Sequence, residues 1–496
     1  MILTCRKYGN LLELSLGGTE ALPRELCCLI EPQLEYQHKR FLYGLERYGY
    51  DGVERSVQLT QKKMYRYDQF GRLVTNFGFF WRLRHYLREK GHELDCFDYD
   101  PPRVRPDCYT YDLNRVQRHF DFRARQEECL RSVLDNNMGV VWAATGFGKM
   151  VQLVMKCLAT PHAKTDIVTR RTVIANKIWS FLTRYIADIG RVGDGKKDER
   201  RITVYNADSL HHSSFDADDV LCDEGHELLA DDYATQLGRY THARLFAYTA
   251  SPHGRSDGAD MRLEALFGRM IFYMPYWEAV ELGLVVPIRV ELTDVVLPHN
   301  PVANKSGTYK ERWGIWRNER RNRLVAAKAA SFAADEQVLV LVKTIEHAVY
   351  LRQFLPGWTL VYAPGELEAK YVRQGLVGDD EPKMTPARRD QLREDFESGR
   401  LKKAIATGVW SVGIDPVQLV ALVRAQGGST EIADIQAPGR VSRTHTAGGK
   451  EVGIVCDFVD KFDAGLMRAS QTRIRHYKAM RWDVVNTPTR SEVTLP

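Results

Sequence analysis

The stretch VVWAATGFGKM, Val140–Met150, decides how the rest of this chain is interpreted. It begins with an apolar run typical of a buried parallel strand, and Gly146 and Gly148 then precede Lys149. Glycines let the backbone N–H groups of a tight turn point inward, because no Cβ blocks them. Such a loop ahead of a helix is an anion cradle, and its lysine can reach the outer phosphates of a nucleotide. An ordinary strand-to-helix turn has the same letters, so the phosphate-binding interpretation depends on the rest of the chain.

Short apolar strands alternate with helices on both sides of a central stretch. The first series of expected strands covers residues 140–144, 166–168, 201–205, 219–222 and 244–250. The second series covers residues 337–342, 358–363, 402–407, 419–425 and 451–458. This alternation predicts α/β domains with parallel sheets and helices on both faces. We expect one such domain at residues 113–290, a second at 291–465, and a basic C-terminal extension at 466–496.

Residues 1–112 form a separate small α+β module. It has a strand-like run at 11–16, a turn at Gln69–Gly71 between strand-like flanks, and a helical pattern at 76–90. Closely spaced prolines at 101, 102 and 106 predict a linker after it. The module is rich in Arg, Lys, Tyr and Phe. That composition fits a DNA-binding surface or solvated charge around a small aromatic core, and both interpretations stay open.

Composition bounds the class of protein. The chain has 496 residues, a net charge of +6, and nine cysteines without a CxxC pair. The cysteine pattern favours a reducing compartment, and no apolar run reaches the length of a membrane span. The first residues are neither a signal nor a transit peptide. We therefore expect a cytoplasmic protein of a bacterium or a phage-infected cell, with no membrane partner.

A carboxylate motif follows the strand at 219–222. Asp223, Glu224, Gly225 and His226 stand about 75 residues after Lys149, within the same expected domain. An aspartate there can orient Mg²⁺, and the next glutamate can position an attacking water. An acidic surface loop is the alternative. Its place after an apolar strand favours the second half of a nucleotide site.

The second domain carries two further motifs. Thr407 stands in Ala-Thr-Gly and is followed by Gly-Ile-Asp-Pro at 413–416; QAPGRVSR occupies residues 436–443. Arg440 and Arg443 are three apart, which places them on one helical face. There they can stabilise charge on a phosphoryl group, as an arginine finger does. A surface arginine pair is the alternative.

The order GFGK, DEGH, TAS, ATG…GIDP, QAPGRVSR resembles that of superfamily 2 helicases and translocases, over about residues 120–460. Residues 251–268 resemble phage branch-migration helicases of the UvsW kind and XPB-like repair helicases. The resemblance implies two RecA-like domains that bind ATP and Mg²⁺ between them. ATP would close the two domains and hydrolysis would reopen them, so that the enzyme steps along DNA.

The resemblance also implies roles for individual residues. The nucleotide-binding residues are Gln126, Thr145, Gly146, Phe147, Gly148, Lys149, Met150, Gly413 and Asp415. The catalytic residues are Lys149, Asp223 (which also holds Mg²⁺), Glu224, His226, Gln436, Arg440 and Arg443. The contacts to the DNA strand are Arg170, Thr249, Ser251 and Thr407.

A basic segment, Lys305–Arg323, lies between the two domains' main motifs. It has seven Lys or Arg against two Glu, with aromatic residues interleaved. Basic groups grip phosphates and aromatic rings stack on bases, so Arg312, Trp313 and Trp316 are further candidate DNA contacts. The alternative is a helix whose tryptophans pack on a domain while its arginines are solvated.

Met150 departs from the family pattern, which has Ser or Thr there to hold Mg²⁺. A thioether is a poor ligand for a hard cation. Either an extra water replaces the hydroxyl, or Mg·ATP binds weakly, or hydrolysis is reduced.

The sequence thus predicts an ATP-dependent helicase or translocase. It would act as a monomer on forked or branched DNA in replication, recombination or repair, with proteins of those processes as partners. One alternative is a nucleotide-gated DNA-binding module with weak turnover, and another is the motor subunit of a restriction or defence complex.

Overall fold

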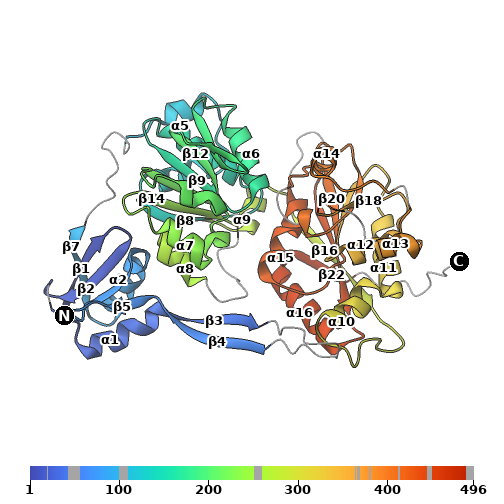
Figure 1. The fold of residues 1–496 in the computed structure, drawn as a ribbon, viewed down its shortest axis with the longest axis horizontal. Coiled ribbons are helices and arrows are strands. Elements are labelled where there is room, and N and C mark those ends of the chain that lie inside the picture. Colours follow the sequence, from blue (N-terminus) through green and yellow to red (C-terminus); the bar gives the residue numbers. More distant parts are fainter. Residues whose placement is uncertain are drawn as a thin grey trace. The chain divides into compact units, whose positions relative to one another are not determined.

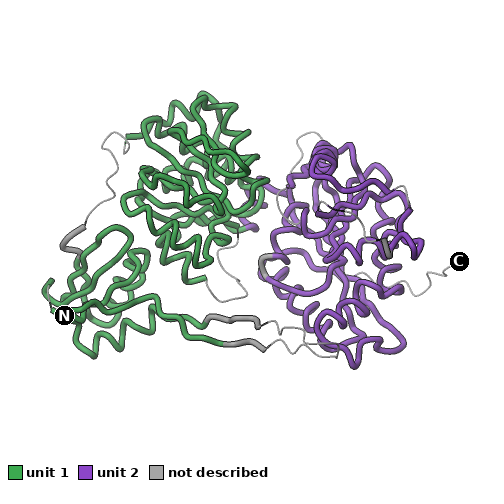
Figure 2. Tube along the Cα trace, viewed as in Figure 1, with its two compact units in different colours: residues 1–40, 58–275 green, residues 41–57, 276–496 purple. Residues whose placement is uncertain are grey.

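The computed structural model describes residues 1–18, 20–42, 56–99, 110–250, 260–363, 365, 369–378, 381–410, 414–443 and 449–486. The chain divides into two compact units, residues 1–40 with 58–275 and residues 41–57 with 276–496 (Figure 2). The prolines of the expected linker lie outside the described residues. Among the helices of the described part, none combines the length and the apolar character needed to cross a bilayer.

The N-terminal domain is a mixed five-stranded sheet packed against helices (Figure 1). Its strand order is β5-β6-β2-β1-β7, with β1 and β7 parallel and the other pairs antiparallel. The sheet strands are β1 (Ile2–Tyr8), β2 (Leu11–Leu16), β5 (Tyr65–Tyr67), β6 (Leu73–Asn76) and β7 (Glu93–Tyr99). The helices are α1 (Arg24–Ile30) and α2 (Phe80–Glu89), and β3 (Glu35–Leu42) pairs with β4 (Ser56–Lys63) in a separate ribbon. Phe80, Leu83 and Leu87 share the buried face of α2, as their helical spacing requires.

An eight-stranded sheet in the order β11-β10-β12-β9-β13-β14-β8-β15 follows. Every adjacent pair is parallel except β10 with β11. Its strands are β8 (Met138–Ala143), β9 (Thr165–Thr169), β10 (Ile189–Gly193), β11 (Lys196–Asp198), β12 (Ile202–Asn206), β13 (Asp219–Asp223), β14 (Arg244–Thr249) and β15 (Met270–Met274). Its helices are α3 (Leu113–Gln117), α4 (Gln126–Leu134), α5 (Lys149–Ala159), α6 (Thr172–Leu182), α7 (Asp231–Leu237) and α8 (Met261–Phe267). Strands β9, β12 and β14 are buried along their whole length, because helices cover both faces of a parallel sheet.

The third sheet is entirely parallel and has the order β18-β19-β17-β20-β21-β16-β22. Its strands are β16 (Ile288–Val295), β17 (Gln337–Leu341), β18 (Thr359–Val361), β19 (Lys403–Ala406), β20 (Leu419–Arg424), β21 (Gly453–Asp460) and β22 (Asp483–Asn486). Its helices are α9 (Tyr276–Glu281), α10 (Gly307–Glu311), α11 (Glu319–Ala330), α12 (Ile345–Arg352), α13 (Ala369–Arg373), α14 (Pro386–Glu397), α15 (Glu431–Gln436) and α16 (Ala464–Ala479). Residues of the expected C-terminal extension form most of α16 and all of β22, and β22 pairs with β16 inside this sheet.

The predicted fold class is confirmed: two parallel-sheet α/β domains follow a small α+β domain. Each of the ten predicted strands overlaps an observed one. Among the strands of the two α/β sheets, the prediction lacked β10, β11, β15, β16 and β22, which lie at or near the edges of their sheets. Such strands are short or only partly apolar, so their sequences give a weak signal.

Candidate nucleotide-binding and catalytic site

Three neighbouring strands of the eight-stranded sheet end in predicted functional residues. The sheet places β14 between β8 and β13, and all three run parallel. The glycine loop follows β8, Thr249 ends β14, and Asp223 ends β13. The carboxyl ends of parallel strands share one edge of a sheet, and ligands of α/β proteins bind at that edge. The topology therefore gathers these three motifs at the expected place for a ligand.

The loop from Ala144 to Gly148 has the backbone geometry of an anion cradle. Gly146 and Gly148 have φ angles of +96° and +97°, which L side chains rarely adopt. Gly148 is the N-cap of α5, so the free N–H groups of this helix face the loop. Thr145 and Met150 are half-buried in the loop and the first helical turn. The Nζ of Lys149 lies 3.2 Å from the carbonyl of Ala143 and donates a hydrogen bond to it.

Two buried side chains, Gln126 and Phe147, fix the conformation of the glycine loop. Gln126 is only 2% exposed, and its Nε2 donates to the Phe147 carbonyl at 2.9 Å. Its Oε1 accepts from the Arg123 backbone N–H at 3.0 Å. The Phe147 ring is buried, with its centroid 5.4 Å from that of Phe272. Gln126 therefore braces the loop, a role the sequence did not indicate, and its contact with adenine stays a prediction.

The carboxylates at the end of β13 are poorly compensated by the protein. Burial and the neighbouring Glu224 raise the pKa of Asp223, and Lys149 opposes that shift. Glu224 has a left-handed backbone, with φ of +50°, and its buried Oε2 accepts no hydrogen bond. A divalent cation bound there would favour the charged form of Asp223 and would offset the missing hydrogen bond of the Glu224 Oε2. In the described part of the chain no three His, Cys, Asp or Glu cluster as metal ligands. Mg²⁺ suits such a site, because it is usually held by one or two carboxylates together with substrate phosphates.

His226 connects the carboxylate motif to the end of β14. It is buried, and its Nδ1 is 2.8 Å from Thr249 Oγ1 and 3.4 Å from Glu224 Oε2. Gly225 precedes it because a Cβ there would lie 2.6 Å from the Cβ of Ala247. Ser251 lies outside the described residues.

Arg170 is exposed directly after β9. The next residue, Arg171, forms an ion pair with Glu227 at 2.6 Å. Glu227 belongs to η5 (Gly225–Leu228), the short 3-10 helix that also contains His226. The loop after β9 is thus tied to the carboxylate motif.

The arginine motif of the second unit lies on a single turn of 3-10 helix, η8 (Pro438–Ser442). Arg440 is buried there, and its Nη1 donates to the Trp410 carbonyl at 3.2 Å. Arg443 follows the last residue of η8 in an extended conformation and forms an ion pair with Asp415. The expectation that the two arginines share one helical face is therefore corrected, because the helix ends between them.

The neighbours of these arginines are also held in place. Gln436 is the last residue of α15. Thr407 is buried after β19, and its N–H donates to the Val361 carbonyl at 3.0 Å. Asp434, which the sequence did not single out, is buried in α15 and accepts from Arg424 Nη2 and Ser429 Oγ, each at 2.6 Å. Gly413 lies outside the described residues.

Ion pairs neutralise most of the basic segment Lys305–Arg323. Five of its seven cations pair with acids: Lys310 with Asp463, Arg312 and Arg317 with Glu346, Arg321 with Asp460, and Arg323 with Glu319. Trp316 is 5% exposed and packs in a cluster with Val302, Ile315 and Leu466, whereas Trp313 is 43% exposed. The geometry thus favours Trp313 over Trp316 as a surface for stacking.

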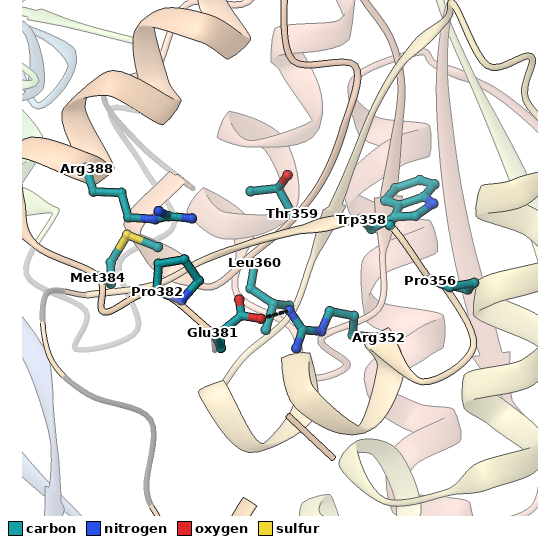
Figure 3. A pocket seen from close by; sticks show the side chains of 10 residues that line it. Arg352, Pro356, Trp358, Thr359, Leu360, Glu381, Pro382, Met384 and Arg388 are labelled. Atoms are coloured by element: carbon teal, nitrogen blue, oxygen red, sulfur yellow. Dashed lines mark hydrogen bonds and ion pairs between the residues drawn. The ribbon is translucent and has the colours of Figure 1, made fainter. Parts of the chain in front are cut away.

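A hollow of about 330 Å³ in the second unit is a separate feature (Figure 3). It lies at the amino end of β18, where Arg352 pairs with Glu381 and the Arg388 guanidinium points inward. None of the predicted site residues lines it. It sits at the opposite end of the parallel sheet from Thr407, so we do not assign it to the nucleotide site.

The fold and the loop geometry define a nucleotide-binding protein of the P-loop kind with tandem α/β domains. No family model matches the chain. "Putative helicase 22" of the Sulfolobus islandicus filamentous virus (isolate Iceland/Hveragerdi) is 22% identical over 472 residues, which cover 87% of this chain and 76% of the relative. "DNA 3'-5' translocase XPB2" of Sulfurisphaera tokodaii is 20% identical over 353 residues, covering 66% and 80%. The structure of S. cerevisiae Dbp5 bound to RNA and ADP BeF3 aligns with a TM-score of 0.53 at 14% identity, over 75% of this chain and 92% of its own.

These findings confirm the predicted relationship. In sequence the chain is similar to a protein named as a helicase and to one named as a DNA translocase, and it shares the fold of Dbp5.

Proposed function

We propose that the chain couples ATP hydrolysis to movement along DNA and acts on forked or branched duplexes in replication, recombination or repair. The observation that carries this proposal is the convergence of the glycine loop, Thr249 and Asp223 on neighbouring strands. The name of the archaeal relative, a DNA translocase, supports DNA as the track.

Bound Mg·ATP would supply the phosphoanhydride and the cation that neutralises its phosphates. The N–H groups of the Thr145–Gly148 loop would bind these phosphates, and Lys149 would leave the Ala143 carbonyl to reach the outer ones. Asp223 would hold the cation. Glu224 would orient a water, and its buried, unbonded Oε2 is suited to accept that water's proton.

The second unit would supply positive charge. Arg440 and Arg443 would stabilise the transferring phosphoryl group, with Gln436 beside them and with Gly413 and Asp415 contributing further nucleotide contacts. The ion pair of Arg443 with Asp415 supports a pre-oriented guanidinium. Arg170, Thr249, Ser251 and Thr407 would contact the DNA strand, and Arg312 and the exposed Trp313 would extend that track, whereas the buried Trp316 would support it from the apolar cluster.

The test is steady-state ATP hydrolysis with a forked DNA, a blunt duplex, an RNA of the same length, or no nucleic acid, at low salt. We expect the fork to stimulate hydrolysis most, and Lys149→Ala to abolish it. Equal rates with and without DNA would contradict the proposal.

Met150 favours a second candidate, a nucleotide-gated DNA clamp with weak turnover. Its thioether occupies the first turn of α5, where a hydroxyl would reach the cation. Single-turnover ATP hydrolysis, compared with the rate of DNA dissociation, separates the two functions. A clamp would bind ATP and DNA tightly, and its rate of ATP hydrolysis would be much lower than its rate of DNA dissociation.

A further inference from the structure

The N-terminal domain packs closely on α8 of the first parallel-sheet domain. Gly78 touches the backbone of α8 so closely that a Cβ there would lie 1.9 Å from the Glu264 carbonyl oxygen. Arg82 of α2 forms an ion pair with the Glu264 side chain, with Nε 2.9 Å from Oε1. Ala265 belongs to the hydrophobic cluster of the N-terminal domain. The exposed face of α2 and the segment after α8 therefore share one surface.

An exposed indole with two guanidinium groups close to its ring marks this surface. Trp81 of α2 is 39% exposed. The Cζ of Arg269, just after α8, lies 4.5 Å from the centroid of its ring, and the Cζ of Arg84 lies 5.6 Å away. Arg88 stands one helical turn beyond Arg84 on the same exposed face of α2. Guanidinium groups that stack on a ring use their flat faces, so their N–H edges stay available for an anion.

These cations differ from those of the basic segment Lys305–Arg323, most of which are neutralised. Within the described residues, no carboxylate lies at ion-pair distance from Arg84, Arg88 or Arg269. Glu89, the acid of α2, pairs instead with His85 at 3.2 Å. Unpaired guanidinium groups around an exposed indole are suited to a polyanion that also carries aromatic groups.

We propose that Trp81, Arg84, Arg88 and Arg269 form a nucleic-acid-binding surface that lies outside the helicase motifs. The three arginines bind successive phosphates, and the exposed part of the indole contacts an unpaired base. The surface belongs to both the N-terminal domain and the first parallel-sheet domain, so a strand bound there is carried with the nucleotide-binding unit. The inference rests on the proposed function, because the ligand is the same DNA.

The experiment measures binding of a fluorescently labelled forked DNA to the full-length chain by anisotropy, across a salt series. The test variants are the double substitution Arg84→Gln with Arg269→Gln, and Trp81→Leu. Arg239→Gln is the matched control, because Arg239 is exposed, belongs to the same unit and stacks on Phe215 at 3.8 Å. Thermal melting checks that each variant is folded.

Each phosphate contact contributes about 0.7 to 0.9 to the slope of log Kd against log salt. The double variant should therefore lower that slope by about 1.5 and raise Kd roughly tenfold near 100 mM salt. Trp81→Leu should weaken binding while leaving the slope unchanged, and Arg239→Gln should change neither quantity. An unchanged Kd and slope in the double variant, with DNA binding by the parent intact, would overturn this inference alone and point to another ligand, such as an acidic protein. Absence of DNA binding by the parent would overturn both this inference and the proposed function.

Discussion

The Nδ1 of His226 lies 2.8 Å from the Oγ1 of Thr249, and this hydrogen bond joins the carboxylate motif to the end of the adjacent strand β14. Both side chains are buried, and the same imidazole nitrogen lies 3.4 Å from Glu224. A change in Glu224 on hydrolysis is thus one side chain away from the residue proposed to contact DNA.

Removing the Thr249 hydroxyl should uncouple ATP hydrolysis from DNA binding. A lost hydrogen bond of about 1 to 1.5 kcal/mol predicts roughly a tenfold loss of DNA stimulation in Thr249→Val. The rate without DNA should stay near that of the parent. ATPase assays with and without forked DNA measure both rates. Thr169→Val is the matched control, because the hydroxyl of this buried threonine at the end of β9 has no hydrogen-bond partner. Equal losses of DNA stimulation in the two variants would contradict a coupling role for Thr249.

Met150→Thr should restore a cation ligand. By analogy with the loss of one charge-stabilising donor, we expect a rise in kcat of up to about 10²-fold. Half-maximal activity should also need less Mg²⁺. The measurement is a Mg²⁺ titration of ATP hydrolysis, with Met150→Val as the control of similar shape that lacks the hydroxyl. If kcat rises no more in the threonine variant than in the valine variant, the natural site works without a hydroxyl ligand to Mg²⁺.

Gly148→Ala should weaken nucleotide binding. Its φ of +97° costs an L residue about 1 to 2 kcal/mol. The new Cβ would also lie 2.9 Å from Gln126 Nε2 and disturb the brace on Phe147. We expect about a tenfold rise in the Kd of a fluorescent ATP analogue. Gly195→Ala is the control, because Gly195 has φ of +76° but open space around its Cβ position. Similar Kd values for both variants and the parent would show that the brace does not matter.

Asp166 should make the stability of the first unit depend on pH. It is 1% exposed, and burial raises its pKa to about 6 despite hydrogen bonds from Tyr240 and Ser213. The folded-state pKa lies above the unfolded one, so this contribution is complete below about pH 4 and is lost as the pH rises through 6. The loss amounts to at most about 3 kcal/mol.

Asp166→Asn should remove this dependence. Urea unfolding at several pH values measures it as the difference in unfolding free energy between variant and parent, which should shift in favour of the variant between about pH 4 and 6. Asp232→Asn, at an exposed position of α7, is the control. A constant difference across that range would contradict the assignment.

The sequence predicted the strands and the order of the motifs well, because these depend on local patterns. VVWAA is apolar whichever way the chain folds, and parallel strands buried on both faces need such runs. Burial within the basic segment was not predictable. Trp313 and Trp316 have equivalent surroundings in the sequence, and Val302 and Leu466, which the chain brings together from far apart, cover only Trp316.

Long-range pairing also explains the other differences. Acids distant in sequence, such as Asp460 and Asp463, neutralise cations that the sequence shows as a basic run. The stack of Arg269 on Trp81 joins residues of two domains, and no local pattern announces it. Likewise, Gln126 shows its role as a brace only once the loop closes over it.

The central claim is that arginines of the second unit act on a nucleotide held by the glycine loop and carboxylates of the first. Its most direct test is Arg440→Gln, assayed for hydrolysis of ATP in the presence of forked DNA and for binding of a fluorescent ATP analogue. We predict that hydrolysis falls on the order of 10³-fold while the Kd of the analogue changes less than about tenfold. Hydrolysis at the parent rate by a folded Arg440→Gln protein would contradict the claim.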